Sequence, residues 1–161
     1  MSVPSKLITI SAFVLVINFG IVAAFDSTAP SEVDVSEPLT YMRIFSDAVG
    51  GSHFSIEEMP FTLVDYAPPA PPVSVSAPLD AESVVFLSSP PGWHGDWHPA
   101  PHRQFMFLLS GELEVEVSDG EIRRFRPGAV ILVEDTSGSG HVSRVVGEER
   151  CYMAAIPLDV E

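Results

Sequence analysis

The sequence predicts an all-β domain, folded as a sandwich or closed barrel, behind an N-terminal hydrophobic helix. The chain has 161 residues, enough for one domain, and contains 15 prolines and 11 glycines. So many breakers disfavour long helices and favour short strands joined by tight turns. The clearest strand lies in residues 111–120, where Leu113, Val115 and Val117 alternate with glutamates. This alternation is typical of a strand with one buried and one solvated face.

Residues 1–25 carry the hydrophobic segment. Lys6 precedes an uncharged run over residues 7–25, in which small residues follow the apolar core, as in Val22-Ala23-Ala24. This order is typical of a secretory signal peptide. The run also has about the 20 residues that a bilayer-spanning helix needs, so an uncleaved anchor is the alternative. We therefore expect a secreted or extracytoplasmic protein, or one held at the membrane by this segment alone.

Residues 26–38 read as an acidic, flexible linker, and residues 39–161 as the folded domain. A short helix is expected near residues 41–49, and His53 is expected in a loop beside Gly50-Gly51. Asp119-Gly120 predicts a tight hairpin turn. Short apolar or alternating runs predict strands over residues 61–66, 84–87, 105–109, 113–117, 122–125, 129–133, 141–146 and 151–156.

The formal net charge is −14, and the first half of the domain is strongly acidic. Nucleic acid is excluded as a partner, because phosphate binding needs a basic surface. The same charge disfavours docking of the domain on an anionic membrane. Cys151 is the only cysteine, which excludes an intrachain disulfide, and its apolar neighbours predict a buried thiol.

The candidate functional residues are histidines. His98, His102 and Gln104 lie in one short stretch and are all even-numbered. On an extended chain, where alternate side chains point to the same side, all three would share a face. A straight strand would nevertheless hold the two histidines roughly 13 Å apart, so both can reach one metal only if the chain bends. His141, after a glycine loop, would supply a donor from a separate element. His94 is left out, because Gly95 and Asp96 predict a turn.

The sequence thus predicts metal ligands at His98, His102, Gln104 and His141. Imidazole nitrogens with an amide oxygen and water suit iron, manganese, zinc, copper or nickel, and the ligands alone do not select among them. Each histidine also has a plainer interpretation as a surface or hydrogen-bonded residue.

These residues resemble the motifs of the cupin superfamily. The start of its first motif is matched by Gly92 and His98, which are separated by five residues. The end of that motif is matched by Gln104 and Gly111, which are separated by six. Pro127-Gly128 and His141 occupy the region of its second motif, with a longer gap. Two of the four usual ligand positions differ from the motif: Ala100 replaces its second histidine, and Gln104 replaces its glutamate. The stretches 97–101 and 134–141 also resemble a subgroup of small uncharacterised cupin-domain proteins.

The resemblance implies a double-stranded β-helix, a cupin-type jelly-roll barrel, with a ligand or metal pocket inside. One hypothesis is a metal-dependent enzyme of oxygenase or isomerase type acting on a small molecule. In it, Tyr66, Arg103 or Arg144 would orient an acidic substrate. The alternative is a non-catalytic barrel with a degenerate metal site, and a third is an oligomerising domain, since cupins often form homodimers. The expected pocket residues are Trp93, Trp97, Phe105, Phe107 and Arg144.

Overall fold

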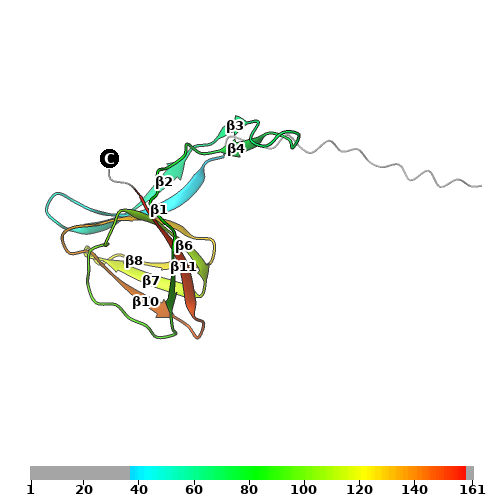
Figure 1. The fold of residues 1–161 in the computed structure, drawn as a ribbon. Coiled ribbons are helices and arrows are strands. Elements are labelled where there is room, and N and C mark those ends of the chain that lie inside the picture. The colour runs from blue at the N-terminus through cyan, green and yellow to red at the C-terminus, as the bar shows by residue number, and fades with distance from the viewer. Residues whose placement is uncertain (1–36, 159–161) are drawn as a thin grey trace, which may run out of the picture. The chain divides into compact units, whose positions relative to one another are not determined.

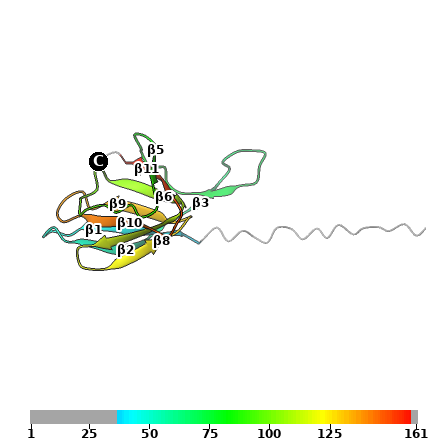
Figure 2. The same ribbon diagram turned by 90° about the horizontal axis from the view of Figure 1, so that it is seen from below.

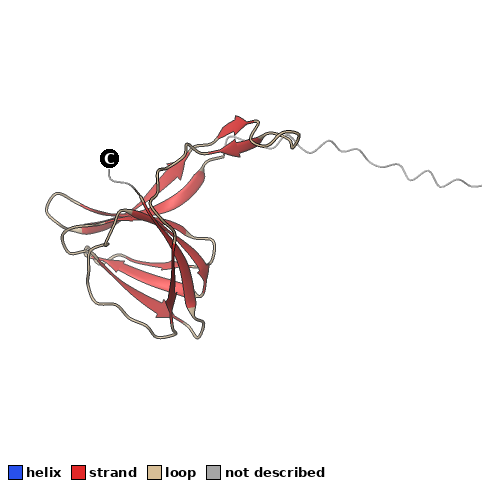
Figure 3. Ribbon diagram, in the orientation of Figure 1, coloured by secondary structure: helices blue, strands red, loops and turns tan. Residues whose placement is uncertain are grey.

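The computed structural model describes residues 37–158, and every regular element in that range is a strand (Figure 3). The all-β prediction is confirmed there, whereas the hydrophobic segment over residues 1–25 lies outside the described residues. No helix long and apolar enough to cross a membrane occurs within residues 37–158. The strands, in chain order, are β1 (Leu39–Ser46), β2 (Ser52–Met59), β3 (Thr62–Val64), β4 (Val73–Val75), β5 (Val85–Ser89), β6 (Gln104–Ser110), β7 (Glu112–Val117), β8 (Ile122–Phe125), β9 (Val130–Glu134), β10 (His141–Val146) and β11 (Cys151–Pro157).

Two sheets make the barrel. The larger has six strands in the order β2-β1-β9-β6-β11-β5, and the smaller has three in the order β10-β7-β8. The two sheets face each other in Figure 1. All described pairs are antiparallel except that of β1 with β9. Strands β1 and β2 lie side by side along the barrel in both views (Figures 1 and 2). The short strands β3 and β4 pair only with each other.

The strand pairing is nested. The β7–β8 hairpin is innermost, β6 pairs with β9 around it, and β11 pairs with β5. Between these levels, the segment over residues 93–98 pairs with β10 through two isolated bridges, His94 with Arg144 and His98 with His141. A long hairpin wound in this way around a barrel is a jelly roll. The two sheets therefore form a jelly-roll barrel, with β1 and β2 added to the larger sheet.

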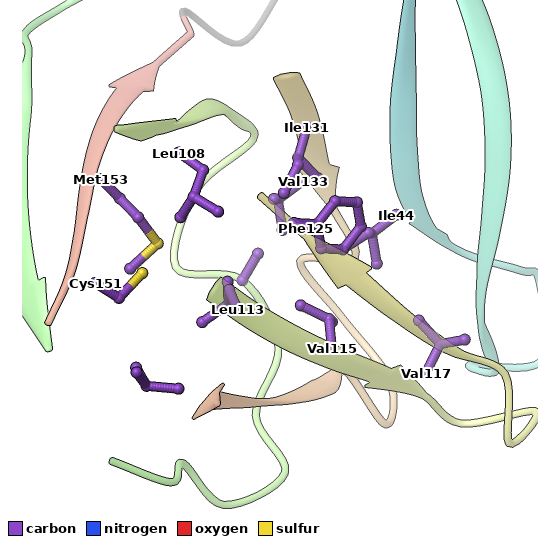
Figure 4. Close-up of a cluster of buried hydrophobic side chains, with 12 residues drawn as sticks. Ile44, Leu108, Leu113, Val115, Val117, Phe125, Ile131, Val133, Cys151 and Met153 are labelled. Atoms are coloured by element: carbon purple, nitrogen blue, oxygen red, sulfur yellow. The ribbon is translucent and has the colours of Figure 1, made fainter. Parts of the chain in front are cut away.

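Alternating side chains fill the barrel from both sheets. Leu113, Val115 and Val117 on β7 are buried, as predicted, while the glutamates between them are half-buried on the outer face. They pack with apolar side chains of the larger sheet, among them Ile131 and Met153 (Figure 4). Because both sheets bury their inner faces in one core, the apolar side chains point inward on strand after strand.

The region near residues 41–49 differs from its prediction. It forms β1 and the following turn, where a helix was expected. Ile44 points into the barrel core, whereas Tyr41 packs on the outer face of the sheet against Phe105. Apolar side chains on both faces hide the period of two that would mark a strand. His53 was expected in a loop, but it lies on β2 and pairs with Phe45 of β1.

Candidate functional site

A cavity of about 620 Å³ opens inside the barrel. Strands of both sheets contribute to its wall, including β5, β6, β9 and β11 of the larger sheet and β7 and β10 of the smaller. Most of the side chains that line it are apolar, and the polar ones include His98 and His141. A largely apolar, partly enclosed space of a few hundred Å³ with a few convergent polar groups is the usual form of a small-molecule site.

The histidine end of the cavity is built by the segment over residues 93–98. It runs antiparallel to β10, and its backbone bonds join Gly95 N to Ser143 O at 2.9 Å and His98 N to His141 O at 3.1 Å. Between its two bridges the segment has one residue more than β10. Such a bulge re-aims the side chains that follow it. This irregular pairing brings His98 beside His141, although 43 positions separate them in the sequence.

The two imidazole rings form a close pair. Their centroids are 4.9 Å apart, with the planes tilted by 52°. His98 Nδ1 lies 2.7 Å from the backbone oxygen of Asp96, and because a carbonyl only accepts, the ring nitrogen donates. In the neutral form of the ring, Nε2 of His98 is then the acceptor. Both residues line the cavity.

Asp135 orients the second ring. Its Oδ2 accepts a hydrogen bond from His141 Nδ1 at 2.7 Å, and the Asp135 side chain is fully buried. A carboxylate behind a histidine fixes the tautomer and the ring direction, so that Nε2 of His141 is the acceptor when the ring is neutral. The sequence analysis did not identify Asp135. It lay within the 134–141 stretch that resembles small cupin-domain proteins, but a single acidic residue after a strand gives no local signal of its own.

Gly140 makes the pairing of the two histidine segments possible. Its φ is +68°, a left-handed conformation that favours glycine, and a Cβ there would lie 2.0 Å from the backbone oxygen of His98. Gly140 O also accepts a hydrogen bond from the buried Ser52 Oγ at 2.5 Å. The close approach of two backbones at Gly140 therefore sets how near His98 and His141 can come.

The other two predicted ligands also reach the cavity wall. The chain bends over residues 101–103, as their separation required, and both His102 and Gln104 line the cavity. Gln104 is buried, and its amide nitrogen Nε2 lies 3.8 Å from Met106 Sδ. The amide oxygen of Gln104 therefore stays available as a hydrogen-bond acceptor. Within residues 37–158, however, no three His, Cys, Asp or Glu side chains are grouped closely enough to hold a metal ion.

The expected pocket residues separate into two groups. Trp93 lines the cavity, but Trp97, Phe105, Phe107 and Arg144 do not. On β6 the even-numbered side chains point inward, so Phe105 and Phe107 face outward and pack with Leu132. Arg144 alternates outward on β10 and pairs with Glu116, at 2.7 Å between Nη2 and Oε2. Hydrophobicity alone could not identify the inner face of β6, because both of its faces are apolar.

The charges around the cavity are sparse. Glu82 is the only charged side chain among its lining residues, all within 37–158, and no Lys or Arg is among them. The three residues expected to orient an acidic substrate lie elsewhere: Tyr66 is exposed, Arg103 pairs with Glu134, and Arg144 pairs on the outer face. The wall thus offers imidazole, hydroxyl and amide groups and apolar surface, and no Lys or Arg among its described lining residues.

No protein-family model matches the sequence, and no curated protein matches it. Solved structures with a similar fold include a conserved protein of unknown function from Streptococcus pyogenes, with 20% identity, a TM-score of 0.38, and 48% of this chain and 64% of that one covered. A cupin 2 conserved barrel domain protein from Salinispora arenicola has 24% identity and a TM-score of 0.40, with 63% and 76% covered. The Cnp3 cupin domain from Schizosaccharomyces pombe has 14% identity and a TM-score of 0.41, with 76% and 85% covered. The chain therefore spans less than two thirds of the length of the Streptococcus protein.

Proposed function

We propose that the protein binds a small molecule inside the barrel, with His98 and His141 as its polar contacts. The observation that carries this proposal is the cavity of about 620 Å³, which has an apolar wall and two oriented imidazoles at one end. Apolar surface would hold the body of the ligand and the ring nitrogens would fix its direction. Export and homodimer formation stay predictions.

Strand β5 offers a matched pair of variants for the test. Ser89 lines the cavity, whereas its neighbour Ser88 points to the opposite face of the strand, where its Oγ accepts from Arg150. A phenylalanine at residue 89 would fill part of the cavity, and the same side chain at residue 88 would stand outside it. Both substitutions lie on an edge strand, where a larger side chain is tolerated best.

The full-length chain is titrated with N-phenyl-1-naphthylamine, an uncharged dye that fluoresces in apolar surroundings. We expect saturable binding to the wild type and to Ser88→Phe, and binding about tenfold weaker to Ser89→Phe, since one filled subsite removes on the order of 1.4 kcal/mol. Circular dichroism confirms that both variants are folded. Equal affinity of the two folded variants would sink the proposal, because the dye would then bind outside the cavity.

A metal-dependent enzyme is the second candidate, and the hydrogen bond from His141 to Asp135 favours it. Ligand histidines commonly donate their second ring proton to a carboxylate in this way. The fit is partial: His98 and His141 would hold the ion through Nε2, with Gln104 as a weak third donor, and the other usual ligands are missing. A bound iron, manganese, zinc, copper or nickel ion would supply Lewis-acid or redox chemistry.

Elemental analysis separates the two candidates. The purified full-length chain is compared with a His98→Ala, His141→Ala double variant after incubation with each of the five metals. Near-stoichiometric metal in the wild type, lost in the double variant, would support the metal-dependent enzyme. No retained metal from any of them would leave the metal-free binding barrel.

A further inference from the structure

We propose that the cavity selects ligands whose polar end donates a hydrogen bond, such as a small, largely apolar alcohol or phenol, and rejects carboxylates of the same shape. This inference rests on the proposed binding function and names its ligand class. It departs from the acidic substrate expected from the sequence, and it depends on the tautomers of two rings and on the charges of the cavity wall.

The ring nitrogens of His98 and His141 give the first step. Each Nδ1 donates to an oxygen of the protein, the Asp96 backbone in one case and the Asp135 carboxylate in the other, at 2.7 Å in both. A neutral imidazole with a protonated Nδ1 is an acceptor at Nε2. Within residues 37–158, the hydrogen bonds of both rings are made through Nδ1, and none is made through Nε2. In their neutral forms the two rings, whose centroids are 4.9 Å apart, would therefore present two acceptors to the cavity.

Two further polar side chains of the wall, Gln104 and Glu82, give the second step; the hydroxyls of Ser83, Ser89 and Ser143 and the ring of His102 line the cavity as well. Gln104 directs its amide nitrogen toward Met106 Sδ, which leaves the amide oxygen as a further acceptor. Glu82 is an anion, and no Lys or Arg is among the lining residues within 37–158. A carboxylate in this cavity would lose its hydration without gaining a cation, which is costly. A ligand hydroxyl, in contrast, donates a hydrogen bond to Nε2, so that neither the hydroxyl nor the ring nitrogen is left without a partner.

The test uses three ligands of nearly one shape: 4-butylphenol, butylbenzene and 4-butylbenzoate. Each displaces N-phenyl-1-naphthylamine from the full-length chain at about pH 8, where free imidazole is largely neutral. A chelator is present, so that no metal ion supplies a cation. We expect the phenol to bind about three- to tenfold more tightly than the hydrocarbon, the value of one net hydrogen bond, and the benzoate to bind more weakly than either.

Two histidine variants identify the group that discriminates. His98→Leu should reduce the preference for the phenol over butylbenzene, because it removes one of the two Nε2 acceptors. His94→Leu is the control, since His94 lies four residues away on the same edge segment and does not line the cavity. It should keep the full preference of the wild type.

The outcomes separate this inference from the proposed function. Dye binding with no preference for the phenol, or with the benzoate bound most tightly, would overturn the ligand class and leave the binding barrel standing. Absence of saturable dye binding would overturn both. A preference for the phenol that survives His98→Leu unchanged, and is equally unchanged by His141→Leu, would overturn the role given to the imidazole pair.

Discussion

His141 donates a hydrogen bond from Nδ1 to the fully buried carboxylate of Asp135, across 2.7 Å. Asp135 also fixes the neighbouring chain, because its backbone oxygen accepts from Ala100 N at 3.1 Å. Its second carboxylate oxygen, Oδ1, is buried and has no partner within residues 37–158. The His141 ring is therefore the one polar side chain that compensates for the burial of this carboxylate in the described part of the chain.

Replacing Asp135 with alanine should destabilise the barrel and release the ring. His141 Nδ1 would lose its acceptor, and the free energy of unfolding should fall by about 1–3 kcal/mol, the usual loss for a buried hydrogen bond to a charged group. Urea unfolding followed by circular dichroism measures this change. Thr136→Ala, at the exposed neighbouring position, is the control and should change stability by less than about 0.5 kcal/mol.

Asp135→Ala should also change the tautomer of the His141 ring. Long-range proton–nitrogen NMR spectra distinguish a ring protonated at Nδ1 from one protonated at Nε2. We expect the Nδ1-protonated form in the wild type and a mixture in Asp135→Ala, because nothing then fixes the ring. An unchanged tautomer together with unchanged stability would show that Asp135 does not hold the ring in solution.

Gly140→Ala should be far more damaging than an alanine at another left-handed glycine. Gly120, in the β7–β8 turn, has φ +90° and open space within 4 Å of a Cβ, so Gly120→Ala should cost only the backbone strain of about 1–2 kcal/mol. At Gly140 the Cβ would also collide with the His98 backbone, and overpacking adds about 1–3 kcal/mol. Urea unfolding of both variants measures the difference.

Ligand binding gives a second measurement for the Gly140 variant. If the collision separates the two histidine segments, Gly140→Ala should also lose most of its affinity for 4-butylphenol while Gly120→Ala keeps it. Equal losses of stability in the two variants would mean that the close approach at Gly140 is relaxed at no cost.

The sequence predicted the barrel better than it predicted the ends of its strands. The β7 alternation and the Asp119-Gly120 turn are local patterns, and both are confirmed. Strand β1 was predicted as a helix, because the packing of its outer face against Phe105 adds apolar residues where a simple strand would be polar. The nested pairing of strands is a long-range property that periodicity does not contain.

The site shows the same division. The sequence named His98 and His141 as candidate ligands, because both lie in stretches that resemble a known motif. The structure places the two residues side by side. It could not identify Asp135, whose role depends on burial beside β10. It also placed Phe105 and Phe107 in the pocket, since a strand that is apolar on both faces does not reveal which face is inside.

Cys151 should react slowly with thiol reagents in the folded protein. It is fully buried on β11, and burial raises the pKa of its thiol, which disfavours the reactive thiolate. With a disulfide reagent at about pH 8, we expect labelling at least about tenfold slower than in urea, where the chain is open. One equivalent of thiol should appear after unfolding, since the chain has one cysteine. Rapid labelling of the native protein would contradict the buried position.

His53 joins two turns at one end of the barrel. Its Nε2 lies 3.1 Å from Asp47 Oδ2, in the β1–β2 turn, and its Nδ1 lies 2.7 Å from Asp119 Oδ2, in the β7–β8 turn. Hydrogen bonds to Asp47 and then to Asp119 raise the pKa of His53 above its ordinary value of 6.5. In return, the hydrogen bond from His53 lowers the pKa of Asp47 below 3.8. The pKa of Asp119 is lowered first by the backbone N–H of Glu121 and then by His53.

These shifts predict the pH dependence of stability and its sign. Because the folded pKa of His53 is raised, its contribution is complete below pH 6.5 and is lost as the pH rises through the raised value. The carboxylates are shifted the other way, so their contribution is complete above pH 3.8 and is lost as the pH falls through their lowered values. All three groups are charged together between pH 3.8 and the raised pKa of His53.

The free energy of unfolding of the wild type should therefore exceed that of His53→Gln most at about pH 5, and the difference should shrink steadily toward about pH 9. Urea unfolding across this range measures it. His94→Gln is the matched control, because His94 is exposed and makes no ion pair within residues 37–158. A difference for His53→Gln that grows with pH would show that the imidazole is neutral between its two carboxylates, against the raised pKa.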